Sequence, residues 1–261
     1  MRSEKKFLPM GLALIVVLAG ARQTLAQAPA LQPLAAAERT VSWGRLLPNL
    51  ASDQKQIWTF PRKLGRKDVL VPTAVVLGIT AGLVALDPVD TPYFRHSTSL
   101  NRFNQSFSGS NTSYAIVAAP VALYLAGLAR KDSKMQQTAL FAGEAVADAE
   151  ILTVVMKDVD RRQRPIAVPP PGDFDDTWFR DNTHNFRSNG CFPSGHTIAA
   201  FSVATVISRR YGTQHRWVPY VAYGLAGLVG FSRISLAAHF PSDVFMGAAL
   251  GYSISRFTVL R

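Results

Sequence analysis

The amino-acid sequence predicts an all-α fold, a six-helix bundle with its active site at one end. Six apolar stretches have the length of helices and are separated by polar segments; they cover residues 69–86, 113–129, 137–156, 196–211, 217–234 and 243–260. Charged residues and histidines gather at the end of the third stretch, at the start of the fourth, and between the fifth and the sixth. In helices that run alternately up and down, these three positions meet at one end.

The chain begins with a segment that predicts export. Arg2, Lys5 and Lys6 precede an apolar run at residues 7–21, and Ala26-Gln27-Ala28 resembles a signal-peptide cleavage site. We therefore expect residues 1–28 to be a signal peptide, with an uncleaved membrane anchor as the alternative. Either form places the protein outside the cytoplasm, in the periplasm or cell envelope, peripheral or integral to the membrane.

Residues 29–68 form an N-terminal extension to an expected catalytic domain of residues 69–261. The beginning of the extension is rich in Pro and Ala. The part that follows is expected to form a short amphipathic helix, because apolar residues recur at helical spacing at Trp43, Leu46, Leu47 and Leu50. A basic group at residues 62–67 follows, so this segment is expected either to contact a membrane surface or to pack on the bundle.

Composition narrows the class of partner. The 261 residues carry a formal net charge of +11, and 48% of them are hydrophobic. This basic excess suits anionic substrates or lipid head groups, and no base-stacking motif accompanies it, so we expect no nucleic-acid partner. Cys191 is the single cysteine, which excludes an intrachain disulfide and indicates a packing role.

Three of the positively charged residues could bind a phosphate group. Lys157 and Arg164 stand in a K-x6-R-P pattern, and Arg233 follows the fifth apolar stretch. Arginine offers a planar fork that matches pairs of phosphate oxygens, and lysine adds a compact point charge. The neighbouring Arg161 and Arg162 are interpreted as a solvated face or loop.

A helix N-terminus adds to this anion site. Ser194 and Gly195 immediately precede the fourth apolar stretch, so the backbone N–H groups of the first turn point toward an anion. Cations and N–H groups together suit a tetrahedral phosphate, and they suit its five-coordinate transition state better, without a metal ion.

Two histidines take separate roles in this interpretation. Asp243 follows His239 by four residues, one helical turn, with Pro241 near a helix start. The carboxylate can hold the imidazole of His239 in one tautomer and leave its other nitrogen free to attack phosphorus. His196 would protonate the leaving oxygen and then activate water.

These groups of residues resemble the signature of the type 2 phosphatidic acid phosphatase superfamily, which also holds the bacterial class A acid phosphatases and the vanadium haloperoxidases. The matching residues are Lys157, Arg164, Pro165, Pro193, Ser194, Gly195, His196, Ser232, Arg233, His239 and Asp243. The resemblance implies an α-helical bundle of that type, a phosphohistidine on His239 and His196 as the acid. It implies as phosphate ligands Lys157, Arg164, Ser194, Gly195 and Arg233.

The implied activity is metal-independent hydrolysis of phosphate monoesters or lipid (di)phosphates on the extracytoplasmic side. The natural substrate stays open between a phosphorylated lipid and a small phosphomonoester. No cofactor is expected, and vanadate would bind as an inhibitor. An alternative interpretation is a vanadium-dependent haloperoxidase, in which vanadate is the cofactor. Members of that branch are usually much larger than this chain. A non-catalytic bundle is a third reading, although such relatives usually lose a histidine or an arginine.

The loop between the first two groups of site residues, residues 166–191, is Pro-rich and then acidic. We expect it to cover the mouth of the pocket and to shape the choice of leaving group. Its aspartates, Asp173, Asp175 and Asp176, are interpreted as a solvated acidic loop rather than as a metal site.

The sequence gives opposing indications about the membrane. Three stretches are apolar enough to span a bilayer, namely residues 69–86, 113–129 and 217–231. Glu144, Asp148 and Glu150 lie inside the third helical stretch, however, and carboxylates are costly in hydrocarbon. The mean hydropathy of +0.11 is also low. The balance favours an exported bundle, soluble or peripheral, over an integral one.

Overall fold

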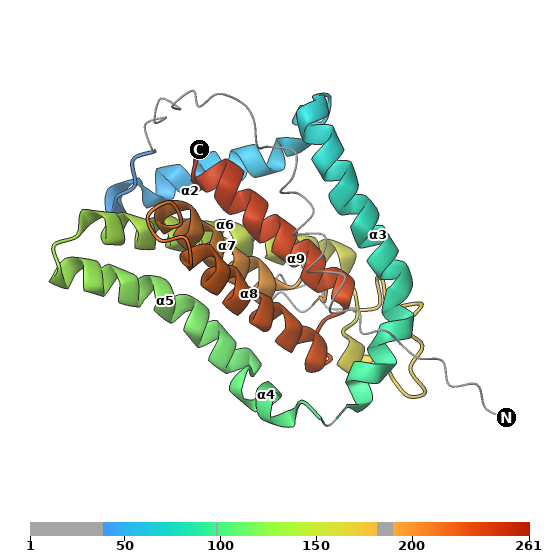
Figure 1. Cartoon of the computed structure of the whole chain (residues 1–261). Helices are drawn as coiled ribbons and strands as arrows, with labels where there is room; N and C mark the ends of the chain where they lie inside the picture. Colours follow the sequence, from blue (N-terminus) through green and yellow to red (C-terminus); the bar gives the residue numbers. More distant parts are fainter. Residues whose placement is uncertain (1–38, 98, 182–189) are drawn as a thin grey trace. The chain divides into compact units, whose positions relative to one another are not determined.

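The regular structure is entirely helical in the part of the chain that the structure describes, which confirms the all-α prediction (Figure 1). This computed structural model describes residues 39–97, 99–181 and 190–261. The predicted signal peptide, residues 1–28, lies outside the described residues.

The six predicted stretches correspond to long helices: α3 (Lys67–His96), α5 (Gly109–Ala129), α6 (Ser133–Asp160), α7 (Gly195–Tyr211), α8 (Val218–Ser235) and α9 (Pro241–Ser253), which continues as the π-helix η4 (Ile254–Val259). Further elements are η1 (Trp43–Arg45), α2 (Leu46–Trp58), η2 (Phe60–Lys63), α4 (Asn101–Ser106) and η3 (Pro165–Ala167). The predicted short amphipathic helix is therefore α2, which is longer than expected, and α4 was not predicted.

Helix α3 extends ten residues beyond its predicted end at residue 86. Pro88 and Pro92 lie inside the helix, beyond its predicted end. Each proline removes one backbone hydrogen bond. Tertiary contacts hold these last turns: the Asp87 side chain accepts a hydrogen bond from the backbone N–H of Ser242 over 3.2 Å, and Phe94 packs edge-on against Phe231.

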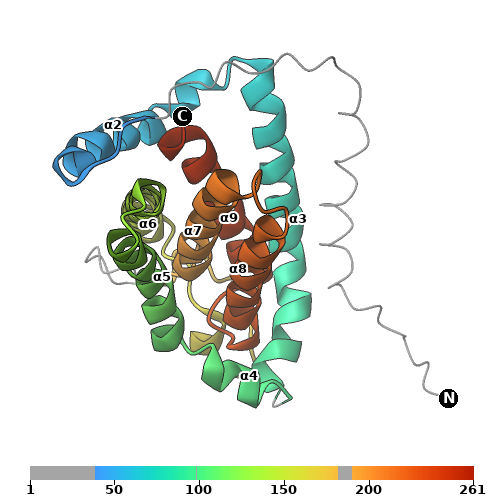
Figure 2. The ribbon, with the colours of Figure 1, turned by 60° about the vertical axis from the view of Figure 1, so that its left-hand side comes forward.

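Helix α7 is the centre of the bundle and packs against α6, α8 and α9. Helix α9 approaches it closely because glycines face α7: a Cβ added at Gly247 would lie 2.9 Å from the carbonyl oxygen of Ser194, and one at Gly251 even closer to that of Ile198. Helices α3 and α5 lie on opposite sides of these central helices (Figure 2). The close packing brings the start of α7 and the start of α9 together.

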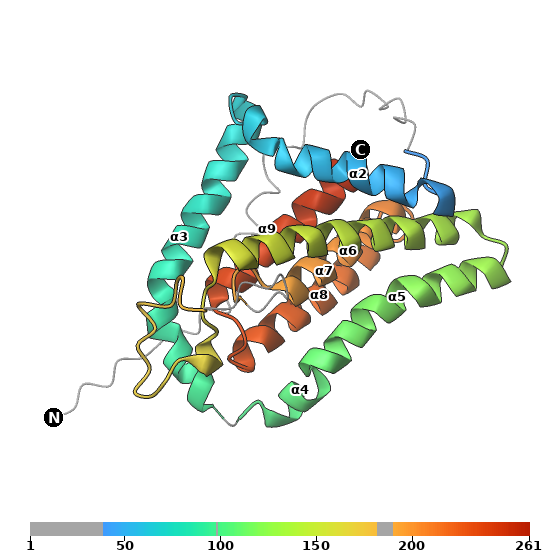
Figure 3. The same ribbon diagram turned by 180° about the vertical axis from the view of Figure 1, so that it is seen from behind.

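Helix α2 runs along α6 (Figure 3). Two carboxylates of α6, those of Glu144 and Asp148, face α2, whereas Glu150 is exposed. The Nδ2 of Asn49 donates to Glu144 over 2.7 Å, and the Nε2 of Gln54 donates to Asp148 over 2.8 Å. Arg39 pairs with both Asp53 and Glu144. Glu144 and Asp148 are therefore buried within protein, and they do not argue against a surrounding bilayer.

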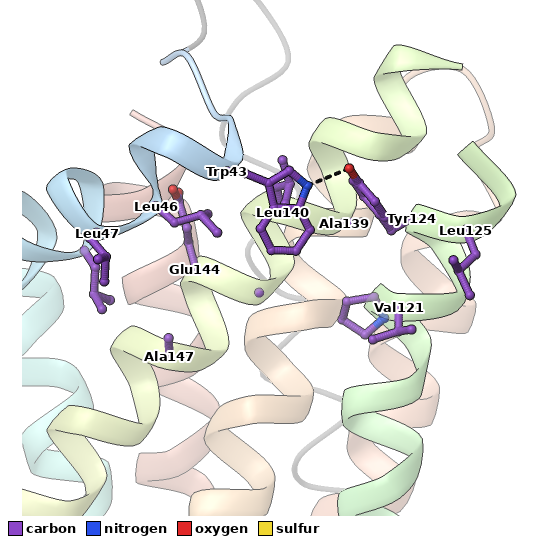
Figure 4. Close-up of a pocket in the computed structure, with 13 residues that line it drawn as sticks. Trp43, Leu46, Leu47, Val121, Tyr124, Leu125, Ala139, Leu140, Glu144 and Ala147 are labelled. Carbon is purple, nitrogen blue, oxygen red and sulfur yellow. Dashed lines mark hydrogen bonds between the residues drawn. The ribbon is translucent and has the colours of Figure 1, made fainter. Parts of the chain in front are cut away.

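Two helices of the described residues are long and apolar enough to cross a membrane, α3 and α5. Only 6% and 17% of their most apolar windows are buried, far less than a core helix would show. Helix α8, which holds most of the third predicted span, is not among them. An apolar pocket between α2, α5 and α6 is lined in part by exposed Trp43, Leu47, Val121 and Leu125 (Figure 4).

Candidate active site

The predicted site residues meet at the end of the bundle where α6 ends and where α7 and α9 begin. The backbone N–H of Ser194 donates to the carbonyl oxygen of Asp243 over 3.0 Å, and the N–H of Cys191 donates to that of Arg162 over 2.8 Å. These two hydrogen bonds tie the start of α7 to α9 and to the segment after α6. Ser194 is the N-cap residue of α7, as the sequence predicts.

The cations surround this helix start. Lys157 is buried near the end of α6, and its Nζ would lie 3.8 Å from a Cβ at Gly195. Burial, and then the charge of Arg164, lowers the pKa of Lys157 to about 8. Arg233 is also buried, and its Nη2 donates to the Oγ1 of Thr112 over 3.0 Å and to the carbonyl oxygen of Phe107. The site thus concentrates positive charge where little water reaches.

His239 lies buried in the short segment between α8 and α9, and α9 begins at Pro241 as expected. Its Nδ1 is 3.5 Å from the Oδ2 of Asp243. Burial lowers the pKa of His239 to about 4, although Asp243 acts in the opposite direction. The imidazole is therefore neutral at neutral pH, which is the form that can attack phosphorus.

His196 is the second residue of α7, and its Nε2 points to the start of α5. It lies 2.9 Å from the Oγ of Ser113 and 3.1 Å from the carbonyl oxygen of Gly109. Burial, and then the charge of Arg233, lowers the pKa of His196 to about 4. The sequence carried no signal for Ser113 or Gly109, because neither belongs to a motif.

Arg162 is not a solvated residue, and the prediction that it lies on a solvated face was wrong. Its side chain is buried, and its Nη1 donates to the Oδ1 of Asp243 over 2.6 Å. Its Nη2 donates to the Oδ2 of Asp87 over 2.7 Å. The guanidinium lies 3.9 Å from the ring centre of Phe240 and 4.5 Å from that of Trp178. These partners keep it out of water. Asp87, an acidic residue directly after the apolar stretch of residues 69–86, was the one feature of the sequence that could have indicated a buried cationic partner.

Asp243 is ionised in this environment. Burial alone would raise the pKa of its carboxyl group, but Arg162 and hydrogen bonds from His239 and Cys191 bring that pKa below the ordinary value. The carboxylate also caps α9, because its Oδ2 accepts a hydrogen bond from the backbone N–H of Phe240 over 2.7 Å.

Cys191 lies beside both residues. Its Sγ is 2.8 Å from the Oδ2 of Asp243 and 3.5 Å from the Nδ1 of His239. These three side chains form a group whose donor atoms could hold a metal ion. Burial raises the pKa of the thiol well above its usual value, and Cys191 packs with Val168, Phe174 and Phe240. A neutral thiol that donates to Asp243 accounts for this geometry.

The described part of the loop at residues 166–191 packs against Phe240, the residue that follows His239. Val168 and Phe174 are buried against Phe240, whereas the acidic residues are exposed, namely Asp173, Asp175 and Asp176. Residues 182–189 of the predicted cover lie outside the described residues.

Comparison with known proteins gives a family. Residues 138–261 match the model of the PAP2 superfamily, a range that includes every predicted site residue. The chain is 43% identical over 60 residues to the lipid A 1-phosphatase of Porphyromonas gingivalis, covering 23% of this chain and 14% of that protein. It is 32% identical over 115 residues to the decaprenylphosphoryl-5-phosphoribose phosphatase of Mycobacterium tuberculosis, covering 44% and 56%. It is 38% identical over 72 residues to the phosphatidylglycerophosphatase B of Bacillus subtilis, covering 25% and 36%.

The chain thus spans between 14% and 56% of the length of these relatives. The crystal structure of a transmembrane PAP2 type phosphatidylglycerolphosphate phosphatase from Bacillus subtilis overlaps 83% of this chain and 92% of that one, with a TM-score of 0.41 and 20% identity. The family assignment rests on the sequence matches rather than on that overlay. Residues 138–261, which carry the complete signature, therefore form a PAP2 superfamily region of this chain.

Proposed function

We propose that this protein is a phosphatase of phosphorylated lipids that works through a phosphohistidine intermediate. One observation carries the proposal: a buried, neutral His239 faces the carboxylate of Asp243 within a group of cations. The names of the relatives support it, because each denotes a phosphatase and several denote lipid substrates.

In the first step, the phosphate group binds to Lys157, Arg164 and Arg233 and to the N–H groups at the start of α7. The Nε2 of His239 attacks phosphorus, and the bond to the leaving oxygen breaks with its electron pair on that oxygen. His196 gives this oxygen a proton. Bound phosphate brings negative charge beside the cations that lower the pKa of His196, so binding itself favours the protonated acid.

In the second step, His196 is neutral and removes a proton from a water molecule. The resulting hydroxide attacks phosphorus, and the bond between phosphorus and the Nε2 of His239 breaks. Inorganic phosphate leaves, and both histidines return to their starting forms. The arginines and the lysine stabilise the charge on the equatorial oxygens, the work that Mg²⁺ performs in other phosphoryl-transfer sites.

A cluster of aromatic rings beside the site favours a lipid substrate. Phe103 stacks on Phe107 with ring centres 4.6 Å apart and lies 5.6 Å from the ring of Phe231, which in turn contacts Phe94. The carbonyl oxygen of Phe107 accepts a hydrogen bond from Arg233, so this cluster adjoins the phosphate-binding cations. Acyl chains attached to a bound phosphate would have apolar contacts here.

The outer surfaces of α3 and α5 favour a position in the bilayer. Their exposed large residues are apolar or aromatic and include Leu70, Val71, Val75, Leu77, Val89, Tyr93, Tyr114, Val117, Val121, Leu125 and Leu128. Monomeric soluble proteins seldom expose so continuous an apolar surface. We therefore infer integral membrane association, which reverses the balance drawn from the sequence.

Basic segments lie at the end of the bundle opposite the site, in the connections before α3, between α5 and α6, and between α7 and α8. They comprise residues 62–67, 130–131 and 209–216. Positive loops stay on the cytoplasmic side of a membrane. This distribution supports a site on the extracytoplasmic side, whereas the signal peptide or anchor expected at residues 1–28 would export residues 62–67 and support the opposite side.

The proposed activity is tested with the purified protein in detergent micelles. Phosphatidate, phosphatidylglycerol phosphate and undecaprenyl diphosphate are compared with p-nitrophenyl phosphate, with His239→Ala as the control. We expect the value of kcat/KM for one lipid to exceed that for p-nitrophenyl phosphate by about 10²-fold, because remote apolar contacts lower the barrier. Vanadate should inhibit and EDTA should not. Loss of activity with EDTA, or equal turnover by His239→Ala, would contradict the proposal.

A further inference from the structure

A chain of buried ion pairs connects α3 to the carboxylate beside His239. Arg162 stands between two carboxylates, with Asp243 at 2.6 Å and Asp87 at 2.7 Å. All three side chains are at most 1% exposed. Removing three charges from water is costly, and apolar residues of similar volume often give a more stable core. Their presence therefore calls for a role other than stability.

The contacts of Asp243 show what the arrangement fixes. Arg162 binds its Oδ1, while its Oδ2 accepts hydrogen bonds from the N–H of Phe240 and the thiol of Cys191. Both oxygens are thus held, and the plane of the carboxylate is set. Oδ2 is also the oxygen that faces the Nδ1 of His239 over 3.5 Å. A rotation of the carboxylate would remove it from the imidazole.

Arg162 is itself held in place by neighbours on every side. The rings of Phe240 and Trp178 flank its guanidinium, and its Nε donates to the Oγ1 of Thr177 over 3.3 Å. Its Nη1 also donates to the Oγ of Ser242 over 2.8 Å. A guanidinium with this many partners cannot follow a moving carboxylate and instead dictates the position of that carboxylate.

Asp87 completes the arrangement from the far side. It accepts hydrogen bonds from Arg162 and from both the backbone N–H and the hydroxyl group of Ser242. Ser242 immediately precedes Asp243 in the first turn of α9. Asp87 therefore holds the guanidinium and the helix start that together determine where Asp243 stands.

We propose that Asp87 and Arg162 are positioning residues for the phosphatase site: they hold Asp243 so that it keeps His239 in the tautomer with a free Nε2. This inference rests on the proposed function. Asp87 precedes the family-matched range of residues 138–261, so the machinery of this chain reaches beyond that range. Asp87 and Arg162 act through Asp243 and do not touch the phosphate group.

The kinetic test is a double-mutant cycle between Asp87→Asn and Asp243→Asn, measured on the full chain in detergent. Asp87→Asn should lower kcat by about 10–100-fold, as loss of a supporting partner does in other sites. KM and the affinity for vanadate should stay within about threefold, because the phosphate ligands are unchanged. When Asp243→Asn is already present, adding Asp87→Asn should lower kcat by less than about twofold, because the effect of Asp87 passes through Asp243.

Asp90→Asn is the matched control, since it removes a carboxylate from the same helix three residues further on; it should leave kcat within about twofold. Ser242→Ala is a second variant for the case that Asp87→Asn does not fold, as judged by size-exclusion chromatography. Ser242→Ala removes one hydroxyl group that contacts Asp87 and Arg162, and it should lower kcat as Asp87→Asn does. Losses that add fully in the double mutant would overturn the positioning role.

A second readout does not depend on turnover. Nitrogen-15 NMR of labelled histidines, with His239 assigned by its absence in His239→Ala, reports the tautomer of the ring. The wild-type ring should show one tautomer with the proton on Nδ1, and Asp87→Asn should show a mixture. An unchanged tautomer would overturn the inference even if the wild-type protein were active. Conversely, absence of phosphatase activity in the wild-type protein would refute the proposed function, while the tautomer comparison would still decide the positioning role.

Discussion

The Nε2 of His196 lies 2.9 Å from the Oγ of Ser113, so the proposed acid is oriented from α5. The carbonyl oxygen of Gly109 stands 3.1 Å from the same nitrogen, and a carbonyl oxygen can only accept. The Nε2 of His196 therefore carries the proton in this arrangement. Helix α5 precedes the family-matched range, and it completes the environment of a histidine within that range.

Replacing Ser113 tests this contact. Ser113→Ala should lower kcat for alkyl phosphates by about 3–10-fold. This loss is only a part of the ~10²–10⁴-fold rate enhancement that a positioned general acid contributes. The loss for p-nitrophenyl phosphate should be smaller, because p-nitrophenolate leaves without a proton. Steady-state kinetics with both substrates measure the difference, and Ser110→Ala, an exposed serine of the same helix, is the control. Equal losses with both leaving groups would show that the contact does not serve the acid.

The pH dependence of kcat/KM should be bell-shaped for p-nitrophenyl phosphate, whose leaving group needs no proton from His196. His239 must be neutral to attack, and its pKa is about 4, so activity should rise as the pH increases through 4. Lys157 must be charged to bind phosphate, and its pKa is about 8, so activity should fall above that pH. Lys157→Arg should remove the alkaline limb, because an arginine stays charged beyond pH ~12. An alkaline limb unchanged in Lys157→Arg would assign it to another group.

Protein stability should also depend on pH because of the histidines. The pKa values of His196 and His239 are lowered from 6.5 to about 4, so the unfolded chain binds more protons than the folded one between these values. Unfolding should therefore become easier as the pH falls from 6.5 toward 4. Thermal unfolding in detergent at a series of pH values measures this trend, and His196→Ala should reduce its slope.

The aromatic cluster predicts a selective effect on lipid substrates. Phe103→Ala should lower kcat/KM for phosphatidate by about tenfold, because a large buried contact area is lost, and it should leave p-nitrophenyl phosphate within about twofold. Phe257→Ala, an exposed ring on η4, is the matched control. Parallel losses for both substrates in Phe103→Ala would show that the cluster supports the fold rather than the lipid.

The contacts between α2 and α6 predict an effect on stability. Glu144→Gln removes the partner of Arg39 and should destabilise the protein by about 2 kcal/mol, less than a fully buried pair because Arg39 is partly exposed. Glu150→Gln, an exposed residue of the same helix, should change stability by less than about 0.5 kcal/mol. Thermal unfolding and tryptic cleavage after Lys55 measure the effect. Equal melting temperatures for the two variants would contradict it.

Local patterns were sufficient to predict the helices and the residues that meet at one end of the bundle. The spacing from Lys157 to Arg164 and the turn from His239 to Asp243 are short-range features that a sequence displays directly. Arg162 shows where such patterns fail: it stands in a basic run that is typical of a surface, but its partners Asp87 and Asp243 lie 75 and 81 residues away.

The same limit applies to the membrane and to α3. Carboxylates inside α6 argued against a bilayer until their partners on α2 were placed, and those partners are about 95 residues distant in the chain. The apolar stretch that predicted α3 ends at residue 86, but tertiary contacts stabilise the helix past Pro88 as far as His96. In each case the deciding interaction joins segments that no local pattern connects.

Phosphorylation of His239 during turnover is tested most directly by rapid acid-free quenching with a ³²P-labelled substrate. The wild-type protein should carry a label that is stable in alkali and labile in acid, as expected of a phosphohistidine. His239→Ala should carry none. His196→Ala should accumulate label from p-nitrophenyl phosphate, because attack proceeds with a good leaving group while the activation of water is lost. Acid-labile label that persists in His239→Ala would contradict the assignment of His239 as the nucleophile.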